Sequence, residues 1–284
     1  MSSPRANPIG LTAYCTRAGD HNDLAMAGAL SVGRILSDRL DIPVATIGEP
    51  ETALNTAWGA ELAAAKPALS ELIDHLEGLF SRQRAPLLAL SRCAASLATL
   101  PVVMRHRPDA CVVWLDAHGD LNTPFTSPTG YLGGMALAGP AGLWDSGFGD
   151  GLPLASIILV GVRDLDPAEQ ALVDTDMVKL VPPKGDYLAQ LRTAVGGRPA
   201  YVHLDCDVLE PGIVPTDYRV PGGFTLAELG DLCRVLAEVE IVGIEIAEFE
   251  NAWAENGLPA SPAAMLDALE PAIARLGMDD GYGS

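Results

Sequence analysis

The sequence predicts an α/β fold built on a mostly parallel sheet. Two observations support this: short strand-like runs alternate with longer helical patterns along the whole chain, and each strand-like run is continuously apolar. A strand of a parallel sheet is covered on both faces, so it lacks the polar alternation of a half-exposed strand. The chain has 284 residues, 49% of them hydrophobic, which is enough apolar material for one sizeable core. We therefore expect a single domain over residues 1–284.

The strand candidates are short runs rich in apolar residues. They lie at 9–14, 43–47, 86–90, 110–115, 155–162, 177–181, 199–205 and 241–247. The longest apolar stretch, around 152–162, is too short to span a bilayer, and the N-terminal segment lacks the apolar region of a secretory signal. The five cysteines are scattered without the spacing of a disulfide framework or a zinc finger. We expect a cytoplasmic protein with reduced thiols.

The helix candidates lie between these strands. They cover 22–40, 57–81, 93–105, 166–174, 184–195, 225–239 and 259–275. Thr225 and Ser261 are the expected capping residues of the last two helices, because their hydroxyls can accept from free backbone N–H groups. Asp166 followed by Pro167 is a further helix start, since proline suits the first helical position.

The charge balance restricts the partners. With 18 Lys and Arg against 37 Asp and Glu, the formal charge is −19. Such a field repels nucleic acid and anionic lipid, so we expect neither as a partner. It would attract a small cation, although an excess of acid also serves simply to keep a protein soluble.

Two polar segments follow strand candidates directly. VVWLDAHGDLNTP contains Asp116, His118 and Asp120, spaced by two, and these would project to one side of an extended chain. The segment YVHLDCDVLEP has the same spacing of two between Asp205 and Asp207. The carboxyl ends of parallel strands share one edge of the sheet, where ligands bind.

These five side chains predict a metal site. Each aspartate alone would more often be a cap or turn residue, but packed carboxylates repel one another and lose hydration, and a bound cation offsets that cost. Oxygen-rich ligation with an imidazole suits Mn²⁺ or Mg²⁺. Two such clusters can bridge two ions and lower the pKa of a bridging water.

With these two segments, the chain resembles the arginase and agmatinase family of ureohydrolases. The resemblance rests on DAHGD followed by NTP, on LDCDVLEP and on EIAEFEN, and it extends from about residue 85 to 250. It implies a three-layer αβα hydrolase, a homotrimer or homohexamer, with two Mn²⁺ ions that cleave the guanidino group of a cationic small molecule. It also implies the ligand roles: Asp116 and Asp205 bridge the ions, Asp120 completes the first site, and His118 and Asp207 complete the second.

Two positions depart from the family pattern. Cys93, in LALSRCAAS, stands where the family has a histidine ligand of the first ion. It either ligates as a thiolate, which Mn²⁺ does not favour, or is a buried thiol that touches no metal. In both cases we expect the first ion to bind more weakly than the second. Gly133 stands where arginases have a proton-shuttling histidine, so protons would move through water or Glu248.

The remaining site residues concern the substrate. Glu248 matches the family glutamate that holds the guanidinium, and with Asp120 it is an expected catalytic residue; Glu245 would support the metal ligands from behind. The resemblance implies further contacts to an amino-acid head group, from Asn122, Thr126, Ser127 and Thr129 to the α-carboxylate and from Asp166, assisted by Glu169, to the α-amino group. Tyr131 replaces an asparagine of the arginase pattern. We expect an arginine-like amino acid rather than a decarboxylated amine.

The departures favour one substrate. An N-hydroxyguanidine is less basic than guanidine and needs less proton delivery, so the chain resembles the branch of the family that converts N-hydroxy-L-arginine to L-ornithine and hydroxyurea. The alternatives are an arginase or another guanidino or formimino hydrolase that releases urea, and a metal-poor, non-catalytic member that acts as a binding subunit. A third alternative makes Cys93 or Cys206 a covalent nucleophile, which the carboxylates around Cys206 oppose.

Overall fold

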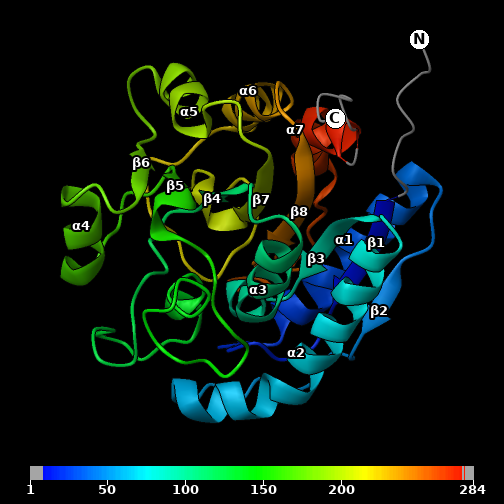
Figure 1. The fold of residues 1–284 in the computed structure, drawn as a ribbon. Helices are drawn as coiled ribbons and strands as arrows, with labels where there is room; N and C mark the ends of the chain where they lie inside the picture. Colours follow the sequence, from blue (N-terminus) through cyan, green and yellow to red (C-terminus); the bar gives the residue numbers. More distant parts are fainter. Residues whose placement is uncertain (1–8, 277, 279–284) are drawn as a thin grey trace.

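The computed structural model describes residues 9–276 and residue 278. Within them, eight parallel strands form one sheet in the order β2-β1-β3-β8-β7-β4-β5-β6 (Figure 1). The strands are β1 (Ile9–Tyr14), β2 (Ala45–Ile47), β3 (Ala85–Leu90), β4 (Cys111–Leu115), β5 (Ile157–Val160), β6 (Lys179–Val181), β7 (Ala200–Asp205) and β8 (Ile241–Ala247). Every residue of β3, β4, β5, β7 and β8 is buried, as the continuous apolar runs predict.

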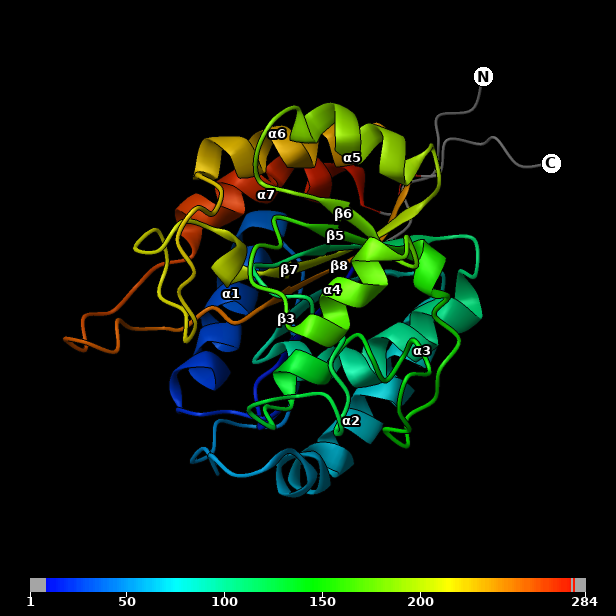
Figure 2. The same cartoon turned by 90° about the vertical axis from the view of Figure 1, so that its left-hand side faces the viewer.

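Seven α-helices of the described chain cover the two faces of this sheet. They are α1 (Leu24–Leu40), α2 (Trp58–Ser81), α3 (Ser96–His106), α4 (Pro167–Asp174), α5 (Tyr187–Val195), α6 (Leu226–Leu236) and α7 (Ala263–Arg275). Figure 2 shows α1, α5, α6 and α7 on one side of the sheet and α2, α3 and α4 on the other. Each face has its own apolar core. The predicted three-layer α/β fold is confirmed.

Local signals set most helix starts correctly. The Thr225 hydroxyl accepts from the Glu228 backbone N–H at 3.2 Å, which confirms it as the cap of α6. Ser261 stands one residue before the capping position of α7, Pro262, but its hydroxyl accepts from the backbone N–H of Ala263, the first residue of the helix, at 3.3 Å as expected. The helix predicted from residue 93 starts instead as a short 3₁₀ turn, Cys93–Ala95, which leads from β3 into α3.

Helix α1 packs closely against the segment that follows β8. A Cβ atom at Gly28 would lie 1.7 Å from the backbone oxygen of Phe249, so only glycine permits this contact. The close approach fixes the chain next to Glu248. Across the described chain, no helix is both long and apolar enough to cross a membrane.

Candidate metal centre and substrate cavity

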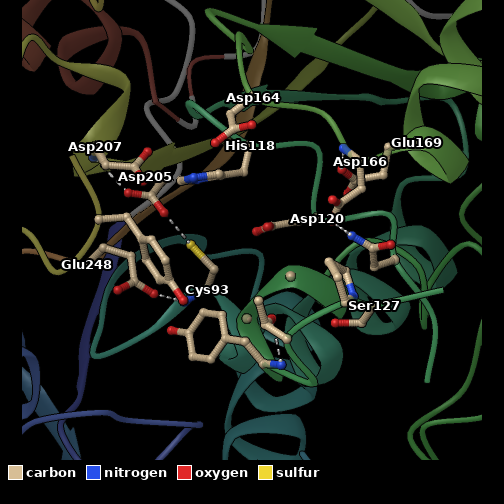
Figure 3. Close-up of a pocket in the computed structure, with 17 residues that line it drawn as sticks. Cys93, His118, Asp120, Ser127, Asp164, Asp166, Glu169, Asp205, Asp207 and Glu248 are labelled. Carbon is tan, nitrogen blue, oxygen red and sulfur yellow. Dashed lines mark hydrogen bonds and ion pairs between the residues drawn. The ribbon is translucent and has the colours of Figure 1, made fainter. Parts of the chain in front are cut away.

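Four neighbouring strands carry the predicted site residues at their carboxyl ends. Strands β3, β8, β7 and β4 are adjacent in the sheet, and Cys93, Glu248, Asp205 and Asp116 lie at or just beyond their ends in that order. Figure 3 shows Cys93, Asp205 and Glu248 turned toward one another. Because all strands run in the same direction, residues distant in sequence meet at one edge of the sheet.

His118 joins two of the aspartates in one group. Its Nδ1 lies 3.3 Å from Asp116 Oδ1 and 3.1 Å from Asp207 Oδ2, and the three side chains could hold one metal ion. Burial would lower the pKa of His118, but the two carboxylates raise it well above its ordinary value. Burial would likewise raise the pKa of Asp207, but His118 lowers it. His118 and Asp207 thus stabilise each other's charged forms.

Cys93, Asp205 and Glu248 form a second group that could hold a metal ion. The Cys93 thiol donates to Asp205 Oδ2 at 3.0 Å. Burial and the charge of Asp205 raise the pKa of Cys93 well above its ordinary value, which opposes a free nucleophilic thiolate. The other nucleophile candidate, Cys206, contacts Met265 at 3.4 Å and does not line the cavity described below.

Asp120 approaches from another side. Strand β4 ends at Leu115, the Asp116 carboxylate accepts from the His118 backbone N–H at 2.7 Å, and Asp120 has φ of 50°. The expectation of an extended chain through Asp116, His118 and Asp120 is therefore wrong: a turn, not strand alternation, directs these side chains. Asp120 still lines the same cavity as His118 and Asp207, and it lies apart from them in Figure 3.

The donor set fits a pair of divalent cations. Burial raises the pKa of the carboxyl groups of Asp116, Asp120 and Asp205 above the ordinary value. Ionising all three together is unfavourable unless a cation offsets their repulsion. Carboxylates combined with imidazole are donors that Mn²⁺ and Mg²⁺ accept, and the Cys93 thiol is a softer donor at one end.

A sequence model of the arginase family matches residues 60–267. The chain belongs to the arginase family. It is 37% identical over 258 residues to an N(omega)-hydroxy-L-arginine amidinohydrolase of Streptomyces lavendulae, covering 90% of this chain and 94% of that protein. It is 29% identical over 224 residues to an arginase of Bacillus caldovelox, covering 72% and 74% of the two chains. The predicted family and enzyme class, a metal-dependent ureohydrolase, are confirmed.

Solved structures of arginase-family proteins share the fold. The arginase from Bacillus subtilis superposes with a TM-score of 0.78 at 21% identity, covering 96% of this chain and 99% of that one. The proclavaminate amidino hydrolase from Streptomyces clavuligerus gives a TM-score of 0.69, also at 21% identity, over 95% and 92% of the chains.

In this arginase-family chain, Glu248 is held by a buried arginine that the sequence reasoning did not single out. Arg92 is fully buried; its Nη1 donates to Glu248 Oε2 at 2.7 Å and its Nε to Asp20 Oδ1 at 3.0 Å. The Cys93 backbone N–H donates to Glu248 Oε1 at 2.8 Å. Glu248 also has φ of 66°, an uncommon conformation that these contacts hold in place. Its carboxylate is thereby fixed at the cavity wall.

His203, a residue of strand β7, contacts Cys93. Its Nε2 lies 3.2 Å from Cys93 Sγ, its Nδ1 lies 2.7 Å from Glu245 Oε1, and its ring stacks on Trp114 at 3.4 Å between centroids. Glu245 therefore lies behind Cys93, with His203 between them. One signal was present: His203 precedes Asp205 by two residues in β7, so both side chains project to the same face.

The loop after Asp120 contributes part of the cavity wall. Asn122 donates to Asp166 Oδ2 at 2.8 Å, and both residues line the cavity. Glu169 accepts from the backbone N–H groups of Leu121 and Asp166, each at 2.9 Å. Glu169 thus fastens the start of α4 to this loop.

The hydroxyl residues of this loop differ in position. Ser127 and Thr129 line the cavity, whereas Thr126 does not. Thr126 is exposed and donates to Asn122 Oδ1 at 3.0 Å. Ser127 and Thr129 accept from the backbone N–H groups of Gly130 and Tyr131. These bonds shape the loop and leave the two cavity hydroxyls free to donate.

Proposed function

We propose that this protein hydrolyses N-hydroxy-L-arginine to L-ornithine and hydroxyurea. The observation that carries the proposal is the packing around Gly133, where the arginase pattern has a histidine. A Cβ atom there would lie 2.4 Å from Cε1 and 2.8 Å from Cζ of Tyr131, so the ring occupies the space of any side chain at this position. A substrate that needs less proton delivery suits such a site. The 37% identity to an enzyme of that name supports the same substrate.

The proposed cofactor is a pair of Mn²⁺ ions. Cys93 and Asp120 would hold the first, His118 and Asp207 the second, and Asp116 and Asp205 would serve both. When bound, such a pair lowers the pKa of water so that a nucleophile is present at neutral pH. We expect the first ion to bind more weakly, because a thiol that is a poor match for Mn²⁺ and has a raised pKa replaces an imidazole.

The protein side chains orient the substrate between two ends of the cavity. The fixed carboxylate of Glu248 would accept from N–H groups of the guanidino end. Asp166 and Asn122, with the hydroxyls of Ser127 and Thr129, would bind the amino-acid head group. These head-group residues lie at the other end of the cavity from Glu248. They would bind groups that an amino acid has and a decarboxylated amine lacks, so they favour a long amino acid.

The reaction balances as a hydrolysis. The water oxygen forms a bond to the guanidino carbon, the bond from that carbon to the side-chain nitrogen of the substrate breaks, and that nitrogen takes up a proton to leave as ornithine. The hydroxylated nitrogen stays with the carbon and is released as hydroxyurea.

One assay tests the proposal against its alternatives. Protein loaded with Mn²⁺ is incubated with arginine, N-hydroxyarginine, agmatine, guanidinobutyrate and formiminoglutamate, and the small product is identified by mass. We expect hydroxyurea from N-hydroxyarginine as the fastest reaction. Faster turnover of arginine, with release of urea, would make the protein an arginase. Absence of both manganese uptake and hydrolysis would favour a non-catalytic binding subunit.

A further inference from the structure

The hydroxyl group of Tyr131 is a buried polar group without a partner. Its Oη is shielded from solvent and has no hydrogen-bond partner among the residues that the structure describes. Tyr131 lines the cavity together with Cys93, Glu248 and Gly133. Buried polar groups in proteins are almost always hydrogen-bonded, so an unpaired hydroxyl at a cavity wall indicates that a ligand completes it.

The position of this hydroxyl is well defined. Oη would be 3.0 Å from a Cβ atom at Gly133, so the phenol occupies the place from which a histidine would act in an arginase. The ring packs against His21 at 4.4 Å and Tyr218 at 5.5 Å between centroids. These aromatic contacts hold the ring independently of its hydroxyl.

The phenol is a neutral donor next to the guanidino end of the cavity. Burial and the nearby charge of Glu248 raise the pKa of Tyr131 well above its ordinary value, so its proton stays in place. A guanidinium offers donors and no acceptor. It can donate to the phenol oxygen, but the phenol proton then remains unpaired. An N-hydroxyguanidine adds a hydroxyl oxygen that can accept that proton.

We propose that Tyr131 is the residue that selects N-hydroxyarginine over arginine, by donating its hydroxyl proton to the oxygen of the N-hydroxy group. This inference rests on the proposed function and names the residue behind its specificity. The single hydrogen bond explains why glycine at 133 and tyrosine at 131 occur together: the glycine provides the space that the phenol fills. N-hydroxyarginine gains a hydrogen bond from this buried donor that arginine cannot form, so the hydroxyl favours N-hydroxyarginine and leaves the binding of arginine nearly unchanged.

The test is Tyr131→Phe, which removes the hydroxyl and keeps the ring. For the manganese-loaded variant, kcat/KM for N-hydroxyarginine should fall by about ten- to a hundredfold, while kcat/KM for arginine changes by less than about threefold. The ratio of the two values is the decisive quantity, because a general loss of folded protein or metal lowers both equally. Tyr187→Phe, on α5 away from the cavity, is the matched control and should leave both values unchanged.

A second variant tests the inference if Tyr131→Phe does not fold. Gly133→Ala should displace the phenol through the short contact with Cε1 and lower the same ratio, with the manganese content unchanged. An unchanged ratio in Tyr131→Phe, or in Gly133→Ala if the first variant does not fold, overturns the inference and leaves the proposed function intact. Wild-type protein that hydrolyses neither substrate overturns the proposed function, and the inference with it.

Discussion

Glu245 is a buried charged residue whose neutralisation should strongly destabilise the protein. This residue is fully buried in β8 and accepts four hydrogen bonds, each 2.7 Å long. The donors are the hydroxyls of Ser96, Thr99 and Tyr201 and the Nδ1 atom of His203. Burial would raise the pKa of Glu245, but His203 and the hydroxyls of Ser96 and Tyr201 lower it below its ordinary value. The carboxylate is therefore charged and fully paired inside the fold.

Glu245→Gln keeps the shape and removes the charge. Hydrogen bonds to a charged group contribute about 1.5–3 kcal/mol each and neutral ones about 0.5–1.5 kcal/mol, so each of the four weakens by about 1–1.5 kcal/mol and together they lose roughly 4–6 kcal/mol. The new amide group also donates where Thr99 and Tyr201 already donate, so their hydroxyls must turn to accept. Small domains have a total stability of about 5–15 kcal/mol, which makes this a large fraction.

Urea unfolding of the metal-free protein measures the effect, and elemental analysis of the loaded protein measures the manganese content. We expect the free energy of unfolding to fall by roughly 4–6 kcal/mol. We also expect less metal at the first site, because His203 no longer holds Cys93 in place. Glu238→Gln is the control: Glu238 forms an exposed ion pair with Arg192 and should change stability by less than about 1 kcal/mol. A Glu245→Gln protein as stable as the control would refute the reasoning.

Three further predictions follow from the site and its support. Cys93→Ala should lower manganese binding at the first site before it lowers turnover; complete loss of activity with both ions bound would instead indicate a nucleophile. Gly28→Ala should lower the free energy of unfolding by about 1–3 kcal/mol, because the new Cβ meets the backbone oxygen of Phe249 at 1.7 Å, whereas Gly59→Ala, with nothing within 4 Å, should not destabilise the protein. The pKa values of Asp116, Asp120 and Asp205 are raised in the metal-free fold, so the fold keeps protons that the unfolded chain releases. The stability of the metal-free protein therefore falls as the pH rises from the pKa values of the unfolded chain toward those of the fold. Manganese should therefore raise the melting temperature more at pH 8 than at pH 5.5, and an equal rise at both pH values would contradict this.

Much of the fold was predictable because its signals are local. The apolar runs of β3, β4, β7 and β8 identify strands covered on both faces, and parallel strands bring their carboxyl ends to one edge. The capping motif at Thr225 marks a helix start for the same reason. At α7 the signal was displaced by one residue: the Ser261 hydroxyl accepts from the first helical N–H, but Pro262 occupies the capping position.

The sequence by itself determined that carboxylates and an imidazole meet at the strand ends. Asp116 and His118 directly follow one apolar strand, and Asp205 and Asp207 follow another. The tertiary structure alone decided which side chains act as pairs. Arg92 and Glu248 are 156 residues apart, and Cys93 and His203 are 110 apart.

Such pairings depend on strand order and on the packing of buried side chains, which no local pattern encodes. The same holds for the Tyr131 ring over Gly133: the two residues are close in sequence, but only the folded loop shows that one fills the space of the other. Local spacing therefore specified the candidate ligands of a metal centre. Packing between distant segments decided what surrounds them, because the cost of burying each charge or donor depends on the partner that the fold supplies.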